Sequence, residues 1–456
     1  RYNMKNILIA IRSIFKKGRH NVMKIVSLGI GLAVGLVLIA KVYFEQSYDD
    51  FYPDRDRVYQ VWAKYQQNGG ELKDYPQTSG GIAPTMQQQI PEIETVTRYT
   101  SFGDWTFTMT DTKMKYSGRC IIADSCFFDI LPRPMLIGNA KEVLSTPMYV
   151  LISSRIAKNI GGDVIGKNFT VDNSPGRTMT IGGVFEEVPE NSHSRYDVIV
   201  SMASAGRFMW EGSPTNMLGN DRYISYVKLH KGVNPLALEE QVCTFVNSYF
   251  PPEEQQKVGL SIDFSFHKLD NLHKELPQVK RMTWILSLLA FALIFTAVMN
   301  YILIVISSIV NRSKEVAVHK CYGASENNIH GMMFGEALVH IVLSLILALL
   351  LILAFRGTVE ELLATSLDSL LLSNGSLVLL GICILVFFVS GFMPGSLYAR
   401  IPVASAFRNY RENKRIWKKA LLLVQFVATG FLVTMLVFVA RQYTFMVNDR
   451  PGYAYE

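Results

Sequence analysis

Five long stretches of this chain are apolar and nearly free of charge, and four of them follow a polar block of more than two hundred residues. The stretches cover residues 25–40, 282–311, 337–355, 369–399 and 420–440. A helix needs about 20 apolar residues to cross the hydrocarbon core of a bilayer, which the last four provide. The first is shorter, but residues 42–44 extend it, and Lys24 and Lys41 can snorkel to the membrane surface. The layout predicts an α-helical transmembrane bundle with a large domain between spans 1 and 2.

Two alternatives apply to these stretches. A buried core helix is plausible at about 12 residues, but these runs are longer. A cleaved signal peptide is the alternative for the first run. No small-residue cleavage site follows Ala40, which favours an uncleaved anchor.

The basic residues near the span ends predict the orientation. Seven basic residues lie in residues 1–24 without an acid, three in 312–320 and seven in 400–419, whereas residues 356–368 are acidic. With five crossings, all the basic segments fall on one side, which the positive-inside rule makes the cytoplasm. We therefore expect a multi-pass inner-membrane protein with a cytoplasmic N-terminus and residues 45–280 in the periplasm. This bias also explains the net charge of +7, and no basic-aromatic platform for nucleic acid is present.

Residues 45–280 have a different pattern. Short runs that alternate apolar and polar residues begin at Arg57, Trp105 and Met179 and predict strands, while residues 82–90, 153–159 and 235–249 have helical spacing. The mixture predicts a large α+β extracytoplasmic domain of one or two lobes.

These residues contain no recognisable catalytic or metal-binding motif. His193, His230, His267 and His273 form no ligand pair at helical spacing, and Ser192-His193 lacks a nucleophile elbow. We therefore expect no catalytic, metal or cofactor site, and no enzyme.

Two groups in this domain leave alternatives open. An acidic cluster beside Arg55 and Arg57 is formed by Asp49, Asp50, Asp54 and Asp56. It is either a calcium site or, in the interpretation that we favour, a solvated turn. Cys120 and Cys126 either pair in an oxidising periplasm or, as we favour, remain isolated thiols.

The most specific stretch joins the second and third runs. Val316, Val318, Cys321 and Tyr322 give an apolar face opposite Lys314, Glu315 and Lys320, which predicts a short amphipathic helix within residues 312–325. Gly323 suits a left-handed C-cap, and Ser325 can cap a following helix. A surface hairpin that merely obeys the positive-inside rule is the alternative.

This stretch resembles the FtsX-like permeases of ABC transporters, in which the loop is a coupling helix that docks on a partner ATPase. His319 departs from the family pattern, which usually has an apolar or small residue there. Residues 393–408 resemble the family's closing motif. The positions that match the coupling motif are Arg312, Lys314, Glu315, Lys320, Gly323, Ala324, Ser325 and, at the entry to the next span, Glu336.

The polar block resembles the MacB-type periplasmic core domain in residues 122–130, 151–158, 165–167 and 180–193. The resemblance implies a porter-like lobe with a second, inserted lobe. Together the two resemblances cover nearly the whole chain.

An internal repeat suggests a duplication. Residues 4–54 and 408–450 share the order of basic segment, span and polar exit, which is typical of duplicated transporter halves. This predicts the first half of a tandem permease, and a permease that has lost its second half is the alternative. The predicted divisions are a basic amphipathic helix 1–24, span 25–44, periplasmic domain 45–280, permease domain 282–399, basic linker 400–419, and fifth span with the start of a second repeat, 420–456.

No P-loop motif occurs, so energy must come from another chain. The runs hold no buried Asp, Glu or Lys, His340 is expected to bond a neighbouring helix, and Gly29, Gly31 and Gly35 are expected to pack spans together.

The motifs and the resemblance together predict a permease subunit that is driven by a separate ABC-type ATPase dimer. The permease chain itself is expected to bind no cofactor. Expected partners are membrane lipid, a second permease half as dimer or pseudo-dimer, and a periplasmic adaptor, outer-membrane channel or lipoprotein. The task is efflux of antibiotics or peptides, lipoprotein release or, less favoured, regulation of wall hydrolases. A membrane-bound sensor or scaffold that relays a signal without transport is the alternative.

Overall fold

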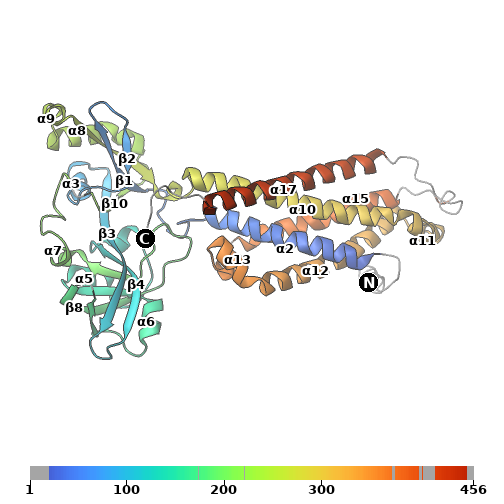
Figure 1. The fold of residues 1–456 in the computed structure, drawn as a ribbon, viewed down its shortest axis with the longest axis horizontal. Helices are drawn as coiled ribbons and strands as arrows, with labels where there is room; N and C mark the ends of the chain where they lie inside the picture. The colour runs from blue at the N-terminus through green and yellow to red at the C-terminus, as the bar shows by residue number, and fades with distance from the viewer. Residues whose placement is uncertain are drawn as a thin grey trace. The chain divides into compact units, whose positions relative to one another are not determined.

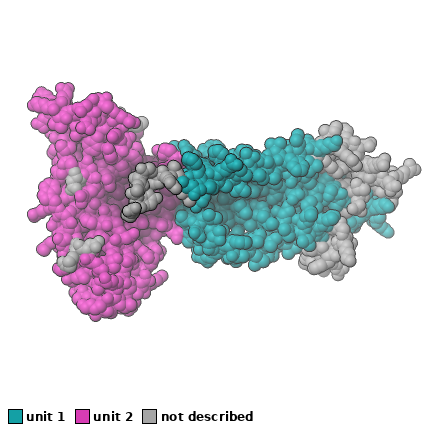
Figure 2. Space-filling model, viewed as in Figure 1, with its two compact units in different colours: residues 1–46, 280–456 teal, residues 47–279 magenta. Residues whose placement is uncertain are grey.

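The computed structural model describes residues 20–172, 174–219, 221–371, 375–399, 403 and 416–448. Residues 1–19, most of the basic linker 400–419 and residues 449–456, for which we predicted a helix, a linker and a second repeat, lie outside the described residues. The chain divides into two compact units, residues 1–46 with 280–456, and residues 47–279 (Figure 2). We call them unit 1 and unit 2.

Unit 1 contains long helices. Among the described residues, five helices are long and apolar enough to cross a membrane: α2 (Asn21–Gln46), α10 (Pro277–Ser307), α12 (Glu326–Ala354), α15 (Ser376–Ala399) and α17 (Ile416–Asn448) (Figure 1). Shorter helices α11 (Ile309–Cys321), α13 (Arg356–Leu363) and α14 (Leu367–Leu371) connect them. The predicted transmembrane bundle is therefore confirmed.

The helix ends differ from the apolar runs. The run 282–311 is interrupted at Ser308, where α10 gives way to α11, and α12 begins at Glu326, well before the predicted span. Run 369–399 is divided between α14 and α15. Hydropathy marks the part of a helix that is apolar and does not report polar turns that continue it.

Glycines let the helices of unit 1 approach closely. A Cβ atom added at Gly31 would lie 2.2 Å from Ala297 Cβ of α10, and one at Gly35 would lie 2.4 Å from Ile294 Cγ1. On another face of α2, the same atom at Gly29 would lie 2.9 Å from Leu347 Cδ2 of α12. The predicted small-residue packing is confirmed, and α2 contacts both α10 and α12 through it.

Unit 2 is a mixed α/β domain, as predicted. Its strands are β1 (Val58–Gln67), β2 (Lys73–Tyr75), β3 (Ile93–Met109), β4 (Lys115–Ala123), β5 (Met135–Ile137), β6 (Tyr149–Ser153), β7 (Asn168–Val171), β8 (Ser174–Phe185), β9 (Val198–Ser201), β10 (Ile224–Leu229) and β11 (Leu260–Lys268). Its helices are α3 (Ile82–Gln89), α4 (Phe127–Ile130), α5 (Ala140–Ser145), α6 (Ser154–Ile160), α7 (Ala205–Phe208), α8 (Glu239–Tyr249) and α9 (Pro252–Val258).

One part of unit 2 is an antiparallel sheet in the order β11-β1-β10-β3. Helices α3 and α8 supply Met86 and Phe245 to a core that also contains Val61 of β1 and Val227 of β10. This part is a sheet with helices on one face, the usual solution for a sheet whose faces differ in polarity.

The other part is a closed barrel. Strand β3 pairs with β4, β4 with β9, β9 with β6, β6 with β8, β8 with β7, and β7 again with β3. Its core contains Phe107, Ile122, Phe169 and Ile181 from four of these strands. The sequence predicted two lobes at most and gave no sign of a closed ring.

Strand β3 belongs to both parts. Its first half pairs with β10 up to Tyr99, its pairing with β4 begins at the same residue, and the register with β4 shifts at a bulge between Ser101 and Gly103. Gly103 has a φ of +74°, a conformation that favours glycine, and a bulge of this kind bends a strand so that its two halves can serve different sheets.

Candidate functional site

The candidate site in unit 1 is α11 with the turn that follows it. The helix ends at Cys321, Gly323 has a φ of +87°, and the Ser325 hydroxyl accepts a hydrogen bond from the backbone N–H of Asn328 (3.4 Å). Left-handed glycine and serine N-cap are the two features that the sequence predicted. Together they fix the direction in which the chain leaves α11 and enters α12.

The faces of α11 are not those predicted. Val316 and Ala317 are fully buried and Ser313 is nearly so, whereas Val318, Cys321 and Tyr322 are exposed, Tyr322 to 89%. The predicted apolar face is therefore confirmed for Val316 and wrong for Val318, Cys321 and Tyr322. Valine and tyrosine occur on surfaces as well as in cores, so hydrophobicity alone does not show which side of a short helix faces the bundle.

The exposed face of α11 combines charge with apolar area. Lys314, Val318 and Tyr322 are spaced by four residues and are exposed on one side, with His319 beside them. Glu315 and Lys320 are half-buried, as is Ala324, which packs against the core. Arg312 belongs to α11, but its side chain lies outside the described residues. This face therefore presents a lysine, a valine and a tyrosine on the outside of the helix.

Glu336 does not join this surface. Its side chain is buried, and its Oε1 lies 3.6 Å from Nζ of Lys24, which is itself 1% exposed and donates to Asn21 Oδ1 (3.2 Å). Lys24 therefore does not snorkel but forms a buried ion pair that joins α2 to α12. Glu336 holds the bundle together and is separate from the exposed face of α11.

Lys41 shows the same pattern at the other end of α2. Its Nζ lies 2.7 Å from Glu45 Oε1 and donates to Thr365 Oγ1, also at 2.7 Å. The expectation that Lys24 and Lys41 snorkel to the membrane surface is thus wrong at both ends of α2, while the apolar runs themselves contain no acid or lysine. The charges stood at the edges of the apolar run, where the sequence alone could not distinguish a snorkelling residue from a paired one.

Further hydrogen bonds join the helices near the start of α11. The Tyr398 hydroxyl of α15 donates to Val305 O and lies 3.1 Å from Ser308 Oγ, directly before α11. Tyr301 OH lies 3.1 Å from Nδ1 of buried His340, which confirms the bond predicted for that histidine.

Two more bonds continue to α2. The Asn300 amide of α10 donates to Ser27 Oγ (2.6 Å), and Ser344 Oγ of α12 donates to Ile25 O (3.1 Å). Since apolar contacts alone drive little association in a bilayer, such bonds help define how the helices pack.

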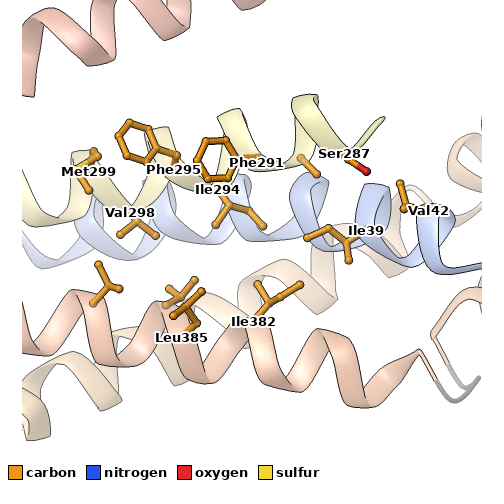
Figure 3. Close-up of a pocket in the computed structure, with 13 residues that line it drawn as sticks. Ile39, Val42, Ser287, Phe291, Ile294, Phe295, Val298, Met299, Ile382 and Leu385 are labelled. Carbon is orange, nitrogen blue, oxygen red and sulfur yellow. The ribbon is translucent and has the colours of Figure 1, made fainter. Parts of the chain in front are cut away.

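An apolar cavity of about 430 Å³ lies between α2, α10 and α15. Figure 3 shows Ile39, Phe291, Ile294, Ile382 and Leu385 around it. Ser287 is the single polar side chain among the described residues that line it, so these residues bring no acid or base for chemistry.

The structure shows the surroundings of two groups in unit 2 for which the sequence left alternatives open. Asp49 is fully buried and accepts hydrogen bonds from Ser192 Oγ and the His193 backbone, so the interpretation as a solvated turn was wrong for this residue. Cys120 and Cys126 are free thiols, as predicted, and burial raises the pKa of both, which disfavours a reactive thiolate. Within the described residues, no three His, Cys, Asp or Glu side chains are placed to hold a metal ion.

Comparison with known proteins agrees with this arrangement. Residues 23–244 match the family of the MacB-like periplasmic core domain, and residues 287–403 match the FtsX-like permease C-terminal family. No curated protein sequence matches the chain.

Several solved structures are similar to about half of the chain. A domain of a putative permease protein from Porphyromonas gingivalis is 33% identical over 48% of this chain and 91% of that one, with a TM-score of 0.44. The periplasmic region of MacB from Actinobacillus actinomycetemcomitans is 14% identical over 48% and 91%, with a TM-score of 0.30. The extracellular domain of the ABC-type transporter YknZ from Gram-positive bacteria is 10% identical over 46% and 98%, with a TM-score of 0.33.

The first family match begins in α2 and covers most of unit 2, and the second runs from α10 past the end of α15. FtsX-like permeases are transmembrane subunits without catalytic activity. The chain therefore belongs to the MacB/FtsX-type permeases of ABC transporters, as a multi-pass membrane protein with a MacB-like periplasmic core domain and an FtsX-like permease domain.

Proposed function

We propose that this permease couples ATP hydrolysis by a separate ABC-type ATPase dimer to movement of its extracytoplasmic domain, and so exports or releases a substrate. In this proposal α11 and its turn lie in the cytoplasm and receive the ATPase. The N-terminus is cytoplasmic and unit 2 is periplasmic, on the basis of the charge bias in the sequence.

The observation that carries the proposal is the division of α11 into two faces. Val316 and Ala317 belong to the same core as Leu28 and Leu32 of α2, while Lys314, Val318 and Tyr322 remain exposed. A helix held by the bundle on one side and open on the other can pass a partner's movement into the bundle. The sequence supplies no P-loop, so the hydrolysing site must be on the partner.

The roles of the predicted coupling residues divide accordingly. Lys314 is exposed for direct contact with the ATPase, and half-buried Glu315 and Lys320 border the same surface. Gly323, Ala324 and Ser325 set the angle between α11 and α12. Arg312 is proposed as a contact residue from its position in the motif alone, and Glu336 acts within the bundle.

The substrate is proposed only by class, as an antibiotic, a peptide or a lipoprotein handled at the outer face. A second permease half, as dimer or pseudo-dimer, and an adaptor or outer-membrane channel complete the proposed assembly. Membrane lipid surrounds the spans, which expose apolar side chains, above all on α17.

Affinity purification of the tagged full-length chain from native membranes tests the proposal. An ABC-type ATPase should be recovered with the wild-type chain and lost with Tyr322→Ala, whereas Glu361→Lys on α13 should retain it. Membrane yield should be equal for all three. Failure to recover any ABC-type ATPase after mild crosslinking would instead favour a sensor or scaffold without transport.

A further inference from the structure

We infer that the two segments by which the chain enters and leaves unit 2 form one clasp, which makes unit 2 respond to α2 and α10 together. The clasp consists of residues 47–57, which follow α2, and residues 269–276, which precede α10. The inference deepens the proposed function and rests on it for the source of the movement. Its structural part, the dependence of each segment on the other, is independent of that function.

An aromatic stack joins the two segments. The rings of Tyr48 and His273 are nearly parallel, at 7°, with centroids 3.4 Å apart. Tyr48 is the second residue after α2, and His273 lies four residues before Pro277 begins α10. The stack therefore links the chain at the two points where it passes between the units.

A ring of four charges joins the same segments. Lys274 Nζ lies 3.2 Å from Asp50 Oδ1 and 3.0 Å from Asp270 Oδ1. Arg55 lies 3.4 Å from Asp50 and 3.6 Å from Asp270. Each segment supplies one acid and one base, and each base contacts both acids, so neither segment can move alone without separating opposite charges.

The four charged side chains are half-buried. Burial by itself would raise the pKa of Asp270, yet the hydrogen bond from Lys274 and the nearby Arg55 lower it overall. Burial likewise lowers the pKa of Lys274, but the hydrogen bonds that Lys274 donates to Asp270 and Asp50 raise it overall. Both directions show that the contacts favour the charged forms.

Asp49 fastens the clasp to the rest of unit 2. Its Oδ1 accepts hydrogen bonds from Ser192 Oγ (2.9 Å) and the backbone N–H of His193 (3.3 Å), and its Oδ2 lies 2.6 Å from His193 Nδ1. The other ring nitrogen of His193 bonds the Tyr226 hydroxyl of β10. The Asn191 amide also donates to Ser47 O (2.7 Å).

Apolar contacts complete the attachment. Tyr52 from the first segment and Leu269 from the second are almost fully buried in one core, which they share with Ile121 of β4 and Ile199 of β9. A displacement of the clasp therefore reaches strands of the barrel and, through Tyr226, the antiparallel sheet. The geometry assigns Tyr48, Asp50, Lys274 and Asp49 as positioning residues in the transmission of movement.

Hydrogen exchange of the full-length chain in lipid nanodiscs tests the clasp. Tyr48→Ala should raise exchange several-fold in residues 269–276, and Lys274→Met should do so in residues 47–57. Tyr48→Phe keeps the ring, and Lys257→Met changes a surface lysine of α9, so both should match the wild type. If each substitution raises exchange in its own segment alone, the clasp does not exist.

Trapping the partner ATPase with nucleotide separates the clasp from the proposed function. Nucleotide should change the hydrogen exchange of both segments together in the wild-type chain. In Lys274→Met, only one of the two segments should still respond to nucleotide. A change confined to one segment in the wild type would overturn the clasp while leaving ATP coupling intact. If nucleotide changes exchange in neither segment, while Tyr48→Ala and Lys274→Met still raise exchange in the opposite segment, the proposed function is overturned and the clasp is not.

Discussion

Lys24 of α2 and Glu336 of α12 form a buried ion pair, with 3.6 Å between Lys24 Nζ and Glu336 Oε1. We predict that Lys24→Met or Glu336→Gln alone destabilises the bundle by about 3–5 kcal/mol, because each leaves a buried charge without its counter-charge. Lys24→Met combined with Glu336→Leu should recover most of the loss. Thermal unfolding of the detergent-solubilised chain measures this, with exposed Arg441→Met as control. A double variant less stable than either single one would contradict the prediction.

The turn after α11 should depend on its glycine. Gly323→Ala should cost about 1 kcal/mol or more, because its φ of +87° disfavours a Cβ atom. The same substitution at Gly357, inside α13 and without close neighbours, should instead stabilise slightly, since alanine is the better helix former. Unfolding midpoints of both variants check the opposite signs. Equal shifts at the two positions would show that the turn is not constrained.

The contact between α2 and α10 should depend on Gly31. Gly31→Ala places a methyl group against Ala297 Cβ and should cost about 1–3 kcal/mol through overpacking. Ala297→Gly in the same chain removes the opposing methyl group and should restore stability. Gly381→Ala on α15, where a Cβ meets open space, is the matched control. Lack of rescue by the second substitution would mean that the two helices do not meet there.

Acid should weaken unit 2 in part through Asp54. Hydrogen bonds from Lys228 (2.6 Å) and Arg57 (3.1 Å) lower the pKa of this carboxyl below its ordinary 3.8. A group with a lowered folded-state pKa adds stability above its unfolded pKa and loses it as the pH falls through the folded one. Asp54→Asn should therefore reduce stability at pH 7 and make its decline below pH 4 shallower.

This test compares the acid slope of Asp54→Asn with that of a control variant and that of the wild type. Exposed Asp56→Asn, which leaves the contacts of Asp54 with Lys228 and Arg57 in place, is the matched control. Burial raises the pKa of Asp124, which contributes a slope of opposite sign, so the comparison between variant and wild type is what counts. An unchanged slope in Asp54→Asn would refute the assignment.

Much of the architecture could be predicted from the sequence, because its signals are local. Long apolar runs marked the five helices, and Gly323 and Ser325 marked the turn, since each needs only its own conformation or its own neighbours. Gly31 and Gly35 indicated close packing for the same reason.

The remainder depends on contacts between distant residues. Lys24 and Glu336 are 312 positions apart, and neither shows in the sequence that it has a buried partner. The sequence around Asp49 is typical of a solvated acidic turn, because its partners Ser192 and His193 lie far away along the chain. Ring closure by β7 and β3 is equally non-local, and which side of α11 is buried depends on where the bundle lies.

The central claim is that a partner's ATP hydrolysis moves unit 2 through α11. The most direct measurement places an environment-sensitive fluorophore on exposed Cys243 of α8, with Cys321 replaced by serine, in the reconstituted complex of permease and ATPase. We predict an ATP-dependent change in emission that is absent in Glu315→Lys and present in Glu361→Lys, with ATP hydrolysis continuing in both. An equal change in Glu315→Lys, or no change in the wild-type chain while ATP is hydrolysed, would contradict the account.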